Sequence, residues 1–189
     1  MVQHYDLEPT LSCLADGGLI LYPTDTVWGI GCDATNEEAV EKVFELKKRD
    51  RSKPFVLLAS SIAMLKKYVK RVHPRIETLL LYHSRPLTII YEKGVDLAKN
   101  ATAADGSVAI RIPNDVFCRE LIERFGKPLV ATSANISGTP FPVHFGQISS
   151  SVIMGVDKVV KHRQLDKEMR EPSVIARLDR EGELVFLRE

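Results

Sequence analysis

The apolar run Leu19-Ile20-Leu21-Tyr22 ends at Pro23, and short runs of the same kind recur along this 189-residue chain. A run of four apolar residues closed by proline is typical of a buried β-strand. A helical pattern follows from Thr35 to about Lys48, and the next apolar run is Phe55 to Ala59. This order of strand, helix and strand predicts an α/β fold.

The chain on either side of these elements continues the alternation. Leucines at positions 7, 11 and 14 mark one face of an amino-terminal helix, which Gly17-Gly18 ends. Thr35-Asn36-Glu37-Glu38 is typical of a capping box with Thr35 as the N-cap. Further elements are predicted in this order: a short helix capped by Ser61, a helix from Pro74 to about His83, strands at 87–91 and 108–112, a helix at 116–125, a strand at 129–132, a helix end and strand within 152–160, and strands at 174–178 and 184–187. Because strands dominate the end, we expect one domain, 1–189, with a mixed sheet.

Composition restricts the class of protein. Apolar residues make up 44% and charged residues 27% of the chain, the balance of a folded globular domain. The three scattered cysteines form neither a disulfide framework nor a zinc motif, and the five histidines show no metal-ligand spacing. No apolar run approaches the roughly 20 residues of a membrane span, and the polar stretch Met1–Asp6 is unlike a signal peptide. We expect a cytoplasmic protein with no metal centre and no membrane contact.

A strong local charge lies within a chain whose net charge is +1. Residues 46–75 contain ten lysines and arginines and one acid, so this window carries +9. Lys66, Lys67 and Lys70 fit the solvated face of a helix. The cations of residues 47–53, here called the basic turn, lie between two regular elements, where they can bind polyphosphate. The sequence therefore leaves two interpretations of residues 46–75, a solvated surface and an anion-binding site.

Polar side chains gather in two loops that follow predicted strands. The first polar loop, 22–31, combines hydroxyls, two glycines and Trp28, and the second polar loop, 131–138, carries hydroxyls, an amide and Gly138. Ligands of open α/β sheets gather beyond the carboxyl ends of strands. Each loop is therefore a ligand site or a turn whose polar groups satisfy one another. The chain has no G-x-G-x-x-G and no G-x-x-x-x-G-K-[ST], which argues against a Rossmann or P-loop nucleotide site.

Arg111 lies in the otherwise apolar predicted strand Val108–Ile112. A buried guanidinium needs an anion, and a planar carboxylate matches its geometry. That anion is either an acid of the protein or the carboxylate of a ligand.

The two polar loops, the basic turn and the strand with Arg111, in their order along the chain, resemble the YrdC-like family. The resemblance extends from about Leu7 to Arg188. The matching residues are Tyr22-Pro23-Thr24-Asp25-Thr26, Gly29-x-Gly31, Lys47-x-Arg49, Lys53, Ser107-x-x-x-Arg111-x-Pro113, Thr132-Ser133-Ala134-Asn135-x-Ser137-Gly138 and Pro172-Ser173. The resemblance implies a twisted mixed α/β sheet with flanking helices around a positively charged cavity. It also implies that ATP carrying Mg²⁺, bicarbonate and L-threonine give threonylcarbamoyl-AMP and pyrophosphate, and that the product passes to a complex that modifies tRNA.

The resemblance also implies roles for single residues. Lys47 and Arg49 would be catalytic and, with Lys53, would hold the ATP phosphates. Further nucleotide contacts would come from Ser107, Asn135, Arg188 and the backbone of Val143. The threonine pocket would be lined by Thr24, Arg111, Ser133 and Ser173.

Three departures from the family pattern alter these expectations. Many members have Pro-Gly-Pro where this chain has Ser84-Arg85-Pro86, so we expect a different turn and an extra cation near the cavity. Longer relatives place a histidine where this chain has Leu58, and they carry an additional carboxy-terminal domain. Two alternatives are open: a non-catalytic module that binds nucleotide or double-stranded RNA, and the related domain of hydrogenase maturation proteins.

Overall fold

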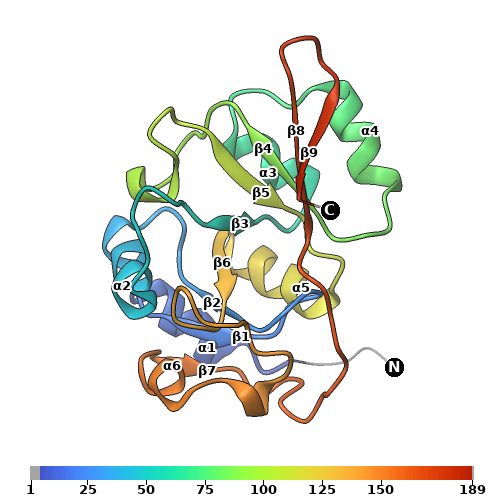
Figure 1. The fold of residues 1–189 in the computed structure, drawn as a ribbon. Coiled ribbons are helices and arrows are strands. Elements are labelled where there is room, and N and C mark those ends of the chain that lie inside the picture. The colour runs from blue at the N-terminus through green and yellow to red at the C-terminus, as the bar shows by residue number, and fades with distance from the viewer. Residues whose placement is uncertain (1–4, 189) are drawn as a thin grey trace.

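A computed structural model describes residues 5–188, so Met1–His4 and Glu189, the ends of the expected domain, lie outside the described residues. Within these bounds nine strands form one sheet in the order β7-β1-β2-β6-β3-β5-β4-β8-β9 (Figure 1). Their bounds are β1 Ile20–Tyr22, β2 Gly29–Gly31, β3 Val56–Leu58, β4 Leu87–Tyr91, β5 Val108–Arg111, β6 Leu129–Ser133, β7 Lys158–Val159, β8 Val174–Leu178 and β9 Leu184–Arg188. Three strand pairs are parallel and five are antiparallel, which confirms the predicted mixed sheet.

Helices flank the sheet along its whole length (Figure 1). Their bounds are α1 Glu8–Ala15, α2 Glu37–Lys47, α3 Ile62–Tyr68, α4 Pro74–Tyr82, α5 Val116–Phe125 and α6 Ser150–Met154, with single 3₁₀ turns at η1 Lys99–Ala101 and η2 Phe145–Gln147. Helix α1 contacts α5, β1 and β7, whereas α4 lies beside β8 and β9.

Local sequence explains where the helices begin and end. The Asp115 side chain accepts a hydrogen bond from the Cys118 amide at the start of α5, and Gly126 ends that helix with a φ of 79°. Ser61 and Pro74 begin α3 and α4, as predicted. The predicted Thr35 cap of α2 is wrong, because Asn36 caps that helix while the Thr35 hydroxyl donates to Asp33.

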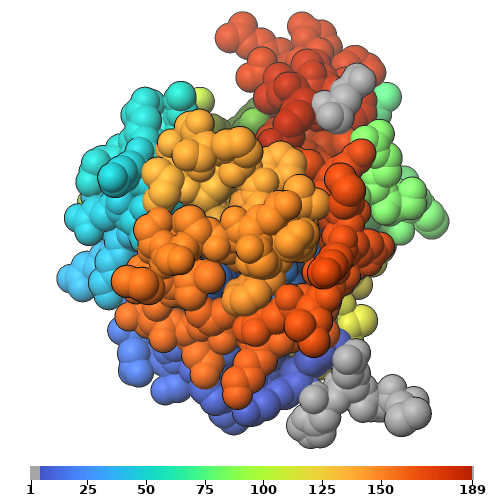
Figure 2. Space-filling model, turned by 60° about the horizontal axis from the view of Figure 1, so that its bottom comes forward, coloured from blue at the N-terminus to red at the C-terminus, as the bar shows by residue number. Residues whose placement is uncertain are grey.

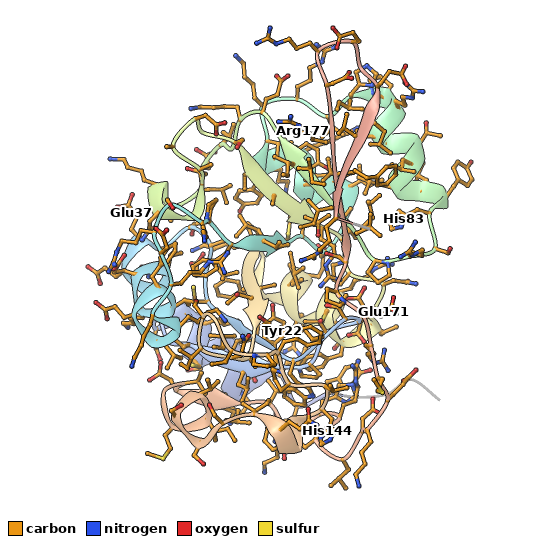
Figure 3. All side chains as sticks on the ribbon, viewed as in Figure 1. Tyr22, Glu37, His83, His144, Glu171 and Arg177 are labelled. Carbon is orange, nitrogen blue, oxygen red and sulfur yellow. The ribbon has the colours of Figure 1, made fainter. Side chains whose placement is uncertain are left out.

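Strand β2 lies inside the first polar loop, where the sequence predicts a turn. It pairs antiparallel with β1 and β6. Its Gly31 is packed so closely that a Cβ atom there would lie 2.6 Å from the Tyr22 ring and 2.7 Å from the Val130 oxygen. The buried Tyr22 also donates its hydroxyl to that oxygen over 3.1 Å, and Figure 3 shows this tyrosine in the interior. A side chain at position 31 would therefore separate these strands.

The β8–β9 hairpin carries one irregularity. Ile175 is opposite Arg188 and Ala176 is opposite Phe186, so Leu187 has no opposite residue and forms a β-bulge. Strand β9 is also the last strand of the sheet. The hairpin therefore presents its carboxy-terminal residues at an edge of the molecule.

Candidate functional site

A cavity of about 610 Å³ opens where the two polar loops, the basic turn and the carboxy-terminal segment meet. This volume lies within the range of small-molecule sites. Figure 2 shows the gold-to-orange chain after β6 between the cyan segment around the basic turn and the red carboxy-terminal segment, with a hollow between the gold and red atoms. Its lining includes Thr24, Thr26, Arg49, Phe55, Ile90, Arg111, Thr132, Ser133, Phe141, Pro172, Ser173, Ile175 and Arg188. Among the described lining residues are three arginines and no aspartate or glutamate.

Arg111 has a protein partner. It ends β5, it is 4% exposed, and its Nη1 donates to the buried carboxylate of Asp25. The second guanidinium nitrogen, Nη2, donates to the Thr26 hydroxyl over 3.2 Å. The other Asp25 oxygen accepts from the amide of Asn114 over 2.8 Å. The anion that Arg111 requires is thus an acid of the protein, Asp25. Arg111 also lines the cavity.

Thr24 is fixed inside the first polar loop. Its hydroxyl donates to the Val27 oxygen over 2.8 Å and lies 2.9 Å from the Thr26 hydroxyl. Arg163, from the connection between β7 and β8, donates to the Thr24 oxygen over 2.7 Å and pairs with Asp115. The loop is therefore held from both sides, and Thr24 faces the cavity with little freedom.

Arg49 is the cation of the basic turn that lines the cavity. Its Nε donates to the Lys53 oxygen over 2.7 Å, and its guanidinium lies 5.2 Å from the centroid of the Phe55 ring. Partial burial lowers the pKa of Arg49 from its ordinary value. The turn therefore presents a preorganised guanidinium to the cavity.

Lys47 is buried against the second polar loop. It is 1% exposed, and its Nζ donates to the main-chain oxygens of Ser133 over 2.5 Å and Asn135 over 2.6 Å. Its own oxygen accepts from the Ser137 amide over 2.8 Å. Burial and the nearby Arg49 lower the pKa of Lys47 to about 8. The ammonium thus holds the second polar loop, and Lys47 is not among the described residues that line the cavity.

The second polar loop is also bonded within itself. The Ser133 hydroxyl donates to the Asn135 amide oxygen over 2.5 Å, and the Asn135 amide nitrogen donates to the Thr139 oxygen over 2.6 Å. Ser133 lines the cavity, whereas Asn135 is outside the described lining. Ordering of the loop by Lys47 and Asn135 therefore sets where Ser133 and Thr132 point.

The carboxy-terminal wall joins Ser173 and Arg188. The Arg188 guanidinium donates to the Ser173 oxygen over 3.0 and 2.7 Å, and the Ser173 hydroxyl lies 2.8 Å from that of Thr88. Burial and the positive charge of Arg111 lower the pKa of Arg188. Two arginines near enough to influence each other form an environment that attracts an anion.

Three further residues expected at the nucleotide are outside the described cavity lining. Lys53 is exposed, and Ser107 is in the turn before β5, where its amide donates to Asp105 over 2.9 Å. The Val143 amide donates to the Gln147 side chain over 2.9 Å. None of the three belongs to the described cavity lining.

Two departures from the family pattern, Leu58 and Arg85, lie among the described residues. Leu58 is fully buried in β3 beside Arg111, so no imidazole faces the cavity from this position. Arg85 is exposed and lines a separate apolar groove, not the described cavity. Arg85 is therefore not one of the cations that line the described cavity.

Asp25 and Thr26 are polar residues of the site that were not assigned a role from the sequence. Asp25 holds Arg111, and Thr26 both contacts Arg111 and lines the cavity. Both belong to the quoted motif Tyr22-Pro23-Thr24-Asp25-Thr26, so the signal was available. Asp25 is the acid of that motif, and Arg111 is the buried cation that requires one.

No group of three or more His, Cys, Asp or Glu side chains within residues 5–188 could hold a metal ion. No helix in the same range is long and apolar enough to cross a membrane.

The fold and the cavity define an α/β protein with a mixed nine-stranded sheet, within the described residues, and an arginine-lined cavity. The model of the Sua5, YciO and YrdC family, described as telomere recombination, matches residues 12–189. The chain therefore belongs to the Sua5/YciO/YrdC family.

Individual relatives agree with this assignment. A threonylcarbamoyl-AMP synthase of Pseudoalteromonas translucida is 37% identical over 135 residues, which cover 70% of this chain and 72% of the relative. The structure of P. abyssi Sua5 complexed with L-threonine superposes with a TM-score of 0.85 at 27% identity, over 96% of this chain and 53% of that one. The structure of E. coli YciO has a TM-score of 0.82 over 97% of this chain and 88% of that one, and at 19% identity it shows the fold alone.

Proposed function

We propose that this protein is an L-threonylcarbamoyladenylate synthase, which makes threonylcarbamoyl-AMP and pyrophosphate from ATP, bicarbonate and L-threonine. The observation that carries the proposal is the convergence of Arg49, Arg111 and Arg188 on one cavity that is also lined by threonine and serine hydroxyls. The name of the relatives and the threonine bound by P. abyssi Sua5 support it.

The chemistry explains why such a cavity suits the reaction. The threonine amine and bicarbonate form a carbamate with loss of water, and this carbamate is an anionic and weak nucleophile. It must approach the α-phosphate of ATP, which is also anionic, and its attack there expels pyrophosphate. Fixed cations around the cavity reduce the repulsion between the two anions, and positioning reduces the entropic cost. No nucleophile of the protein is required.

The proposed roles are those that the family resemblance implies for side chains that line the cavity. Arg49 binds the phosphates, and Arg188 approaches the nucleotide from the carboxy-terminal wall. Thr24, Ser133 and Ser173 contact threonine, and Arg111 orients its carboxylate. Lys47 acts as a positioning residue through the oxygens of Ser133 and Asn135.

Mg²⁺ enters as part of the ATP substrate. The described lining contains no carboxylate that could form a cage for the ion, so the phosphates themselves hold it in this proposal. The product then passes to the complex that modifies tRNA, as the family resemblance implies.

Mass spectrometry of the product tests the proposal. Purified protein is incubated with ATP, Mg²⁺, bicarbonate and threonine, and each substrate is omitted in turn. We expect threonylcarbamoyl-AMP, together with pyrophosphate release that needs threonine and bicarbonate at once. ATP binding without this product would instead identify a non-catalytic nucleotide-binding module.

A further inference from the structure

A second concave site lies on the opposite face of β8 from the arginine-lined cavity. Val174 lines this groove, while its neighbours Ser173 and Ile175 line the cavity. Successive side chains of a strand point to opposite faces of the sheet. The groove measures about 320 Å³, and helix α4 and strand β9 form its sides.

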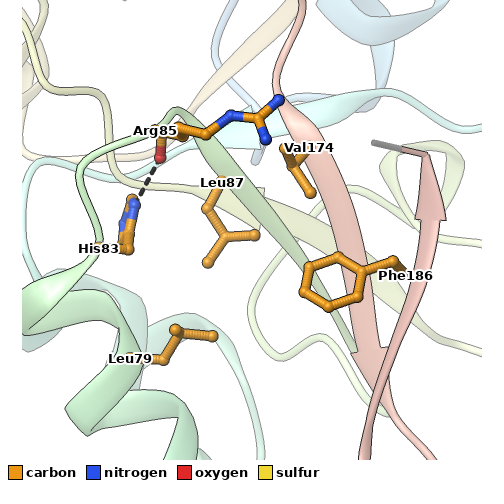
Figure 4. Close-up of a pocket in the computed structure, with 6 residues that line it drawn as sticks. All are labelled: Leu79, His83, Arg85, Leu87, Val174 and Phe186. Atoms are coloured by element: carbon orange, nitrogen blue, oxygen red, sulfur yellow. Dashed lines mark hydrogen bonds between the residues drawn. The ribbon is translucent and has the colours of Figure 1, made fainter.

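The surface of the groove is almost entirely hydrocarbon. Leu87 and Val174 are buried at its base, and Leu79 and Phe186 face the same space from α4 and β9 (Figure 4). Phe186 is 49% exposed although it is a large aromatic residue. An apolar concave surface of this kind gains free energy when an apolar body covers it.

One cation stands at the rim. Figure 4 shows the Arg85 side chain extended along the edge of the groove toward Val174. Its guanidinium has no hydrogen bond or ion pair with the described residues. The turn itself is held, because Nδ1 of His83 donates to the Arg85 oxygen over 2.5 Å. Arg85 is also one of the two residues at which this chain departs from the Pro-Gly-Pro pattern, and it is not in the described lining of the arginine-lined cavity.

We propose that this groove binds a small organic carboxylate. Its apolar body lies against Leu79, Leu87 and Phe186, and its carboxylate meets the guanidinium of Arg85. The groove is at the small end of the range for ligand sites, which favours a free small molecule over a segment of a protein. The proposal stands independently of the function proposed for the cavity.

Fluorine NMR with 4-(trifluoromethyl)benzoate tests this site directly. We expect saturable binding with a dissociation constant of about 1 mM or lower, as suits a ligand of this size. The neutral isostere 4-(trifluoromethyl)benzamide should bind about threefold more weakly, since an exposed ion pair contributes modestly. Amide resonances of His83, Ser84, Arg85, Leu87, Val174 and Phe186 should shift in the wild-type protein.

Three variants separate the parts of the proposal. Arg85→Gln should weaken the benzoate about threefold and leave the benzamide unchanged. Leu79→Asn should weaken both probes. Arg177→Gln, which removes an exposed arginine of β8 outside the groove, should change neither. Melting curves establish that each variant is folded.

Several results would overturn the proposal. These are the absence of saturable binding, resonance shifts confined to the arginine-lined cavity, and equal affinity for benzoate and benzamide. If a variant does not fold, the wild-type comparison of the two probes and the map of shifted resonances still decide the outcome.

Discussion

Arg111 and Asp25, 86 residues apart in the chain, form a buried ion pair with side chains that are 4% and 7% exposed. The pair joins the end of β5 to the first polar loop, and Thr26 adds a second contact to the same guanidinium. Because either charge alone would be costly at this depth, the pair fixes the loop against the strand. One wall of the candidate site thus depends on a contact between distant parts of the chain.

Asp25→Asn should therefore destabilise the fold. The variant leaves the guanidinium buried without its counter-ion, which costs about 3 kcal/mol. Urea denaturation measures the free energy of unfolding. Glu8→Gln is the matched control, since Glu8 pairs with Arg124 at the exposed surface and its loss should cost less than about 1 kcal/mol. Equal stability of Asp25→Asn and the wild type would show that the ion pair contributes nothing.

Arg111→Lys should weaken threonine binding by about 1–3 kcal/mol, because lysine keeps the charge but loses the bidentate geometry. ATP affinity should stay near normal. The melting temperature should also fall, since one ammonium cannot reproduce the contacts with both Asp25 and Thr26. Calorimetric titration of threonine, with and without ATP, measures the first effect. Unchanged threonine affinity in a folded variant would restrict Arg111 to its structural pair.

Arg49→Ala should lose about 10- to 100-fold in ATP affinity, which corresponds to one charge-assisted contact with phosphate. Lys66→Ala is the control, because Lys66 is half exposed and paired with Glu77 on the helical surface. Equilibrium binding of ATP compares the two variants. If both bind ATP equally well, the basic turn is not the phosphate site.

Lys47 should make stability depend on alkaline pH. Its pKa is about 8 in the fold and 10.5 in the unfolded chain, so between these values the unfolded state binds more protons. The stability of the wild type should thus rise with pH from about 8 to 10.5, relative to Lys47→Met, by up to about 3 kcal/mol. Urea denaturation across this range measures the difference. Lys42→Met, which alters an exposed lysine of the same helix, is the matched control. If the stability difference between the wild type and Lys47→Met does not change with pH across this range, the assignment is contradicted.

Replacing Cys13, Cys32 and Cys118 together by alanine should leave pyrophosphate release near the wild-type rate. Burial raises the pKa of the Cys32 and Cys118 thiols, so neither forms a reactive thiolate at neutral pH. Iodoacetamide should label Cys32 and Cys118 rapidly only after denaturation. Isolation of a covalent intermediate on any of these cysteines would refute the direct mechanism.

Elements with strong local signals were predicted closely from the sequence. Helix α5 begins after Asp115 and ends before Gly126, as the pattern indicates, because caps act within a single turn. Strands β4 and β8 match their predicted bounds. Strand β2 was missed, since a Gly-Ile-Gly sequence has little strand propensity and becomes a strand through its neighbours.

The site was harder to predict because its contacts join distant segments. Nothing local links Asp25 to Arg111. Lys47, however, could have been placed from periodicity, since it lies three residues after Phe44 and four after Val43 on the buried face of α2. From the sequence, we interpreted Lys47 by its charge and not by its place on the buried face of the helix.

The bulge at Leu187 separates two neighbours that a regular strand would keep together. Residues two apart normally share a face, yet Phe186 lines the apolar groove and Arg188 lines the arginine-lined cavity. The bulge, as much as the presence of an arginine at position 188, decides which face of the sheet carries the positive charge. Removing the single residue Leu187 would leave every other residue type intact and still change what each face of the hairpin offers to a ligand.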